Sequence, residues 1–86
     1  SMTINLDKFQ IDRIKEELRM MYDNKSYCAE EIGSGCINST ETALRIIKID
    51  ASIESTRTIL RLLGINAYYE EGKVILWDNA NDCEVV

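Results

Sequence analysis

The sequence predicts an α+β fold built from an N-terminal helix, a helix–turn–helix pair and a C-terminal β-hairpin. Three observations predict it: an apolar stripe at helical spacing, two capped helical segments, and a Glu-Gly turn between two alternating strands. At 86 residues the chain is long enough for one small domain, which we place over residues 2–78. We expect residues 79–86 to be an acidic, flexible tail.

The first helix is predicted from about Asn5 to Asp23. Its apolar stripe consists of Ile11, Ile14, Leu18, Met21 and Tyr22. Phe9 and Met20 fall together on the opposite side of this helix. Unless a strand covers them, these two side chains are available to a protein partner or to a second copy of the chain.

The first helix is expected to stop at Asn24-Lys25, because asparagine tolerates the left-handed conformation of a helix end. The segment Ser26–Asn38 fits either a short helix or a brief strand. Whichever it is, Gly33-Ser34-Gly35 should end it.

Two further helices are predicted in the middle of the chain. One begins at a cap formed by Asn38 or Ser39 and ends near Lys48, although Leu44–Ile49 would also fit a strand. After a turn at Asp50–Ser52, the other runs to Leu63 and stops at Gly64. The expected core positions are Ala43, Leu44, Ile46 and Ile47 in the first of these helices, and Ile53, Thr56, Ile59, Leu60 and Leu63 in the second.

The hairpin is predicted around a two-residue turn, Glu71-Gly72. This register places Tyr69 opposite Val74 on one face of the hairpin and Tyr68 opposite Ile75 on the other. A two-layer domain can bury only one face of the hairpin by itself. We therefore expect the Val74 face to pack inward and Trp77 to lie in an interface.

Two helices joined by a turn and backed by a hairpin make the fold winged-helix-like, and many such folds bind DNA. The DNA-contacting residues would be Arg45, Lys48, Ser55, Arg57, Thr58 and Arg61. A second framing starts from Ala29–Gly33, which is similar to the first helix of many bacterial helix–turn–helix domains. That resemblance makes Asn38–Lys48 the reading helix. A DNA-binding transcriptional regulator is the alternative function.

The charge distribution favours a protein partner instead. The net charge is −5, and residues 43–65 are the only locally basic part. Spare aromatic and acidic side chains can steer the domain onto a basic protein and anchor it there. The predicted contact residues are Phe9, Met20, Tyr68, Glu70, Glu71, Ile75 and Trp77. Small acidic regulators that occupy nucleic-acid-binding surfaces, including phage inhibitors of host defence, are similar in composition, which implies an inhibitor or regulator.

Several other classes are not expected. The chain has no histidine, so the usual base for a serine or cysteine nucleophile is missing, and we expect no enzyme and no cofactor. Cys28, Cys36 and Cys83 lack metal-ligand spacing and are expected to be reduced, with a Cys28–Cys36 bridge as the alternative. No apolar run is long enough to span a bilayer and no signal peptide is expected, so we predict a cytoplasmic protein.

Overall fold

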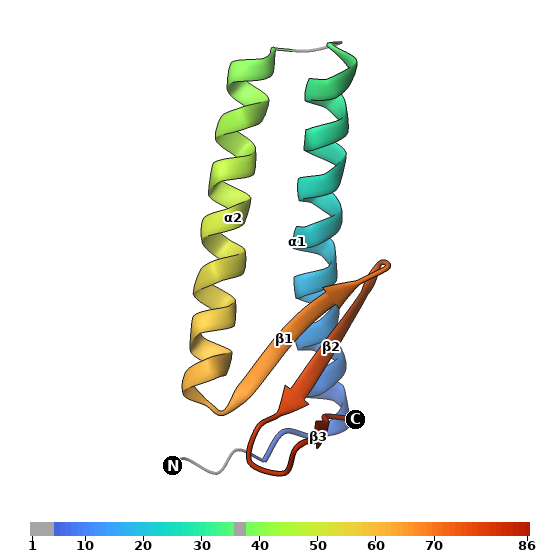
Figure 1. Ribbon diagram of the computed structural model, residues 1–86, viewed down its shortest axis with the longest axis vertical. Helices are drawn as coiled ribbons and strands as arrows, with labels where there is room; N and C mark the ends of the chain where they lie inside the picture. The colour runs from blue at the N-terminus through green and yellow to red at the C-terminus, as the bar shows by residue number, and fades with distance from the viewer. Residues whose placement is uncertain (1–4, 36–37) are drawn as a thin grey trace.

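The computed structural model describes residues 5–35 and 38–86. Two long helices, α1 (Lys8–Ser34) and α2 (Ser39–Leu62), are followed by a three-stranded antiparallel sheet, which confirms the predicted α+β class. The helices lie side by side and run in opposite directions, and the sheet crosses the start of α1 and the end of α2 (Figure 1). The molecule is elongated, with extents of 46 × 21 × 20 Å. The sheet therefore covers only one end of the helical hairpin.

Helix α1 is longer than predicted. The Asp7 side chain accepts the Gln10 amide at 2.8 Å, and Gln10 accepts the Asp7 amide in return, so a capping box starts the helix. The predicted stop at Asn24-Lys25 is wrong. Asparagine tolerates a helix end without requiring one, and the apolar stripe continues to the buried Cys28. The helix ends at Gly35, whose φ of +68° is the left-handed conformation that glycine adopts without strain.

Helix α2 is continuous where a helix–turn–helix pair was predicted. The Asn38 cap is confirmed, because its side chain accepts the amides of Thr40 and Glu41. The predicted turn at Asp50–Ser52 is wrong. Aspartate and serine can cap a helix, but without glycine or proline they also fit inside one. Asp50 instead pairs with Lys25 of α1 at 2.7 Å.

The single helix also changes which residues are buried. Ile53 and Leu60 are buried as expected, whereas Leu44, Ile47 and Ile59 are exposed, contrary to the prediction. In one unbroken α-helix these three side chains point away from the buried face, because successive residues are about 100° apart. The strand alternative over Leu44–Ile49 is excluded as well, since this stretch lies within α2.

The hairpin has the predicted register. Strands β1 (Ile65–Glu70) and β2 (Lys73–Asp78) pair with Tyr69 opposite Val74 and Tyr68 opposite Ile75. Glu71 and Gly72 both have positive φ, at +51° and +78°, as a tight two-residue hairpin turn requires. A short third strand, β3 (Cys83–Glu84), pairs with the end of β2. Residues 79–86, for which a flexible tail was predicted, thus carry a strand of the sheet.

The main core lies where the sheet crosses the helices. It consists of Ile11, Leu18, Leu60, Ile65, Ala67 and Leu76. Val74 packs against this cluster from the same face of β2 as Leu76, which confirms that the Val74 face of the hairpin is turned inward. Farther from the sheet, Cys28 and Thr42 are buried between the two helices. In that part of the molecule the two helices pack only on each other, because the sheet does not cover it.

Candidate protein-binding site

The outer face of the hairpin is the first part of the candidate site. Tyr68 is 45% exposed, and Ile75 and Trp77 are half-buried. The Trp77 indole N–H donates a hydrogen bond to the Asp82 carboxylate at 3.3 Å. This bond holds the indole ring against Asp82, the residue that precedes β3. Glu70 and Glu71 are exposed at the hairpin turn, so the aromatic face has an acidic tip.

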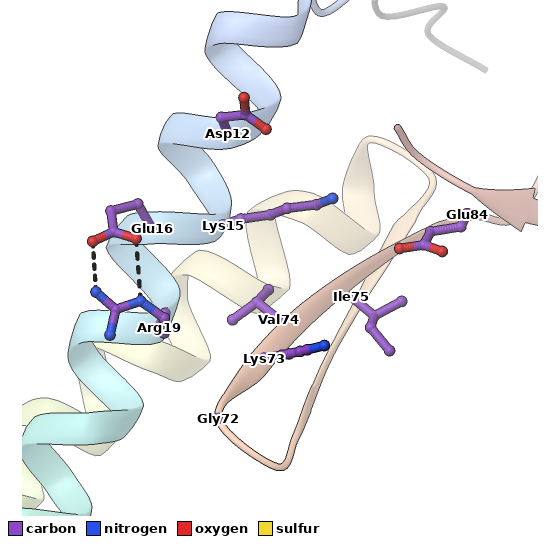
Figure 2. A pocket seen from close by; sticks show the side chains of 9 residues that line it. All are labelled: Asp12, Lys15, Glu16, Arg19, Gly72, Lys73, Val74, Ile75 and Glu84. Carbon is purple, nitrogen blue, oxygen red and sulfur yellow. Dashed lines mark hydrogen bonds and ion pairs between the residues drawn. The ribbon is translucent and has the colours of Figure 1, made fainter.

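A groove of about 470 Å³ separates α1 from β2 and adjoins this face (Figure 2). Ile75 is the one predicted contact residue that lines it. The lining residues are Asp12, Lys15, Glu16, Arg19, Gly72, Lys73, Val74, Ile75 and Glu84. Three of them are acidic and three are basic, so the groove is charged on both sides but has no net charge.

Arg19 is held in place by two carboxylates of its own helix. Its guanidinium lies 2.6 Å from a Glu16 oxygen and 2.6 Å from an Asp23 oxygen, and a second bond to Glu16 makes that contact bidentate (Figure 2). The hydrogen bond from Arg19 lowers the pKa of Glu16, and the same bond raises the pKa of Arg19. Both groups therefore stay charged at neutral pH and neutralise each other.

Two stacked tyrosines tie the hairpin to both helices. The rings of Tyr22 and Tyr69 have centroids 4.5 Å apart. The Tyr69 hydroxyl donates to Asp23 at 2.8 Å, and Arg57 of α2 donates to the Tyr22 hydroxyl at 2.9 Å. The bond to Asp23 raises the pKa of Tyr69, and the bond to Tyr22 raises that of Arg57. This cluster holds the hairpin, and with it the outer face, at a fixed position on the helices.

Phe9 and Met20 lie on a separate surface. Both are exposed, at 75% and 51%, as the sequence predicted if no strand covered them. They are absent from the groove lining, and 11 residues of helix separate them by about 16 Å. The predicted contact residues therefore do not form one continuous surface. Tyr27, seven residues after Met20, is also exposed on α1 and was missed because the helix was expected to have ended.

The predicted DNA-contacting residues do not converge. Arg45, Lys48, Ser55, Thr58 and Arg61 are exposed, but Arg57 is half-buried and bonded to Tyr22. Arg45 and Arg61 are 16 residues apart on one helix, a rise of about 24 Å. Arg61 also donates to its neighbour Thr58 at 3.0 Å. Ala29–Gly33, the other proposed first helix, lies in the last turns of α1.

Other findings bear on the remaining classes. Cys28 and Cys83 are free, whereas Cys36 lies outside the described residues. Over residues 5–35 and 38–86, no three acidic or cysteine side chains come together as a metal site would require. No helix in the same described ranges is long and apolar enough to cross a bilayer.

Comparisons with protein-family models, with curated proteins and with solved structures found no match.

Proposed function

We propose that this protein is a non-enzymatic, acidic binding module that docks the outer face of its hairpin on a basic protein and regulates or inhibits that protein. The observation that carries the proposal is an aromatic face set in an acidic surround. Tyr68, Ile75 and Trp77 lie on one side of the sheet, and residues 66–86 contain five acidic residues and one basic residue. Such a surface combines an apolar anchor with long-range attraction for a cationic partner.

Rigidity supports the same function. A contact side chain that is already fixed loses little conformational entropy on binding, so more of the contact energy becomes affinity. Trp77 is fixed by Asp82, and the hairpin is fixed by the Tyr22–Tyr69 stack. Tyrosine and tryptophan are also the residues most often found at the energetic centre of protein interfaces.

The class of partner follows from charge. Proteins that bind nucleic acids carry basic surfaces, and an acidic module can occupy such a surface in place of the phosphate backbone. The similarity in composition to small phage and mobile-element inhibitors of host defence agrees with this class. A winged-helix DNA-binding regulator has less support, because the bases of α2 are dispersed along the helix and Arg57 is engaged by Tyr22.

A photo-crosslinking residue in place of Tyr68 tests the proposal in extract of the native host. Tyr27 is the matched control, because it is also an exposed tyrosine but lies on the far half of α1. We expect crosslinking of a basic protein from position 68 and none from position 27. Glu70→Lys with Glu71→Lys should weaken the capture, and added salt should weaken it in the wild type.

The opposite pattern would contradict the proposal. Equal crosslinking from both positions would show that the hairpin face is not the binding site. A crosslinking yield that does not change in the Glu70→Lys, Glu71→Lys variant would show the same. Salt-sensitive retention on duplex DNA, lost in Arg45→Ala with Lys48→Ala, would favour the DNA-binding function instead.

A further inference from the structure

Helix α2 carries a largely apolar ridge on the face turned away from α1. The ridge consists of Ile47, Ala51, Ser55 and Ile59 at four-residue spacing, with Leu44 and Leu62 beside its two ends. All six residues are exposed, the four large ones to between 54% and 77%. Within the described residues, no other element covers this face, because the buried side chains of α2 lie on its opposite side.

A helix that is apolar on two opposite faces is typical of a helix packed on both sides. The first face of α2, with Ile53 and Leu60, packs against α1 and the sheet. The ridge is a second face of the same kind. Two exposed charged residues, Lys48 and Glu54, lie directly beside the ridge on opposite flanks, and their charges cancel.

We propose that a second copy of this chain packs on the ridge, α2 against α2, to form a homodimer. Four-residue ridges of two helices interdigitate when the helices cross at about 50°. The helices are then closest at the crossing point and diverge on either side. Ala51 and Ser55 are small and leave room for the crossing, whereas Ile47 and Ile59 are large and fill the gaps beside it.

The order of side chains indicates a copy of the same chain as the occupant. Along the ridge the sizes run large, small, small, large, which is the same in both directions. A two-fold axis brings identical surfaces together, so the surface has to be complementary to itself. This ridge meets that condition, because a large residue lies beside a large one whichever way the second helix runs.

Charge and length agree with this occupant. Two copies of a chain with net charge −5 repel each other, and contact through residues 43–65 is opposed least, because their net charge of +2 is smaller in magnitude than the −3 of residues 1–42 and the −4 of residues 66–86. From Leu44 to Leu62 the surface is about 27 Å long, and because the helices diverge from the crossing point, the pair buries on the order of 1,000 Å² at most. That area is at the lower limit of specific interfaces, so the dimer should dissociate on dilution.

Sedimentation equilibrium of the whole chain tests the proposal, with Ala51→Arg as the disrupting variant. Arginine at the crossing point prevents close approach of the helices, while Ala51 is exposed in the single chain and its replacement leaves the fold intact. Ser52→Arg is the matched control, since it adds the same charge one residue away and off the ridge. We expect dimers for the wild type and Ser52→Arg, and monomers for Ala51→Arg with unchanged circular dichroism.

Ile47→Ser provides a second variant that acts by removing apolar contact and not by adding bulk, and it too should yield monomers. A wild type that stays monomeric at its highest soluble concentration would overturn the proposal and leave the ridge to a different protein. A dimer that survives both Ala51→Arg and Ile47→Ser would overturn it as well. These outcomes are independent of the proposed function, because the ridge and the outer face of the hairpin share no residue.

Discussion

At the scale of single residues, Leu60 and Leu62 of α2 differ sharply in the exposed fraction of their side chains. Leu60 is 4% exposed within the core, and Leu62, two residues later on the opposite side of the helix, is 77% exposed. Leu60→Ala should lower the free energy of unfolding by about 2–5 kcal/mol, because it removes buried methyl groups and leaves a cavity. Leu62→Ala should change it by less than about 0.5 kcal/mol in the monomer. Urea unfolding of both variants measures the difference, and equal losses would contradict the assigned faces.

Tyr69 gives a pH-dependent prediction at the same scale. Its bond to Asp23 raises its pKa above the ordinary value of 10.0, so the folded state binds the phenolic proton more tightly than the unfolded state. The stabilisation by this bond is therefore complete below pH 10 and is lost as the pH rises through the raised pKa. Tyr69→Phe should melt at a lower temperature than the wild type at neutral pH, with the gap closing in alkaline solution. A gap that stays constant with pH would show that the hydrogen bond contributes nothing.

At the scale of elements, the sequence correctly predicted those helix ends and turns that depend on a few neighbouring residues. The Asn38 cap, the stop at Gly64 and the Glu71-Gly72 turn are each written in one to three neighbouring residues, and all three are present. The predicted breaks at Asn24 and Asp50 were wrong, because these residues permit a break without forcing one. What keeps the helices continuous there is contact between them, including the Lys25–Asp50 pair, and such contact is not visible in a local pattern.

The continuity of α2 can be tested with Ala51→Pro. In a helix–turn–helix pair capped at Asp50, residue 51 would be the first residue of the second helix, a position at which proline is favourable. Inside an unbroken helix, proline removes a backbone hydrogen bond and costs about 3 kcal/mol or more. We expect thermal denaturation to show a large loss of stability, with Ala51→Gly losing only about 1 kcal/mol. An unchanged melting temperature for Ala51→Pro would show that the chain turns at Asp50–Ser52 and that α2 is not continuous.

The sequence predicted the faces of the hairpin correctly and the faces of α2 incorrectly. The alternation of β1 and β2 correctly assigned Tyr68, Ile75 and Trp77 to one face of the hairpin, because the turn fixes the register. The ridge on α2 was missed, since Leu44, Ile47 and Ile59 were assigned to the core of two short helices. A small error in the length of an element thus changes the face to which its side chains belong.

At the scale of the whole molecule, the two proposed contact surfaces are separate. The ridge belongs to α2, whereas Trp77 belongs to β2 and is the only tryptophan of the chain. Its emission should be that of a partly hydrated indole and should not change when dilution dissociates the dimer. Binding of a partner to the hairpin should shift the emission to the blue. A blue shift on self-association alone would mean that copies meet through the hairpin.

The sheet covers one end of a long helical hairpin, and this placement has a kinetic consequence. Amide hydrogens exchange with solvent when their helix opens locally, and opening is easiest where few apolar contacts hold it. Around Leu18 and Leu60 opening requires loss of the whole core, whereas around Cys28 and Thr42 it requires only separation of two helices. Deuterium should therefore enter the far end first, and a second copy on α2 should slow it there. The end of the molecule under the sheet is thus rigid, whereas the far end of the two helices opens locally. Self-association through α2 would make this local opening less frequent.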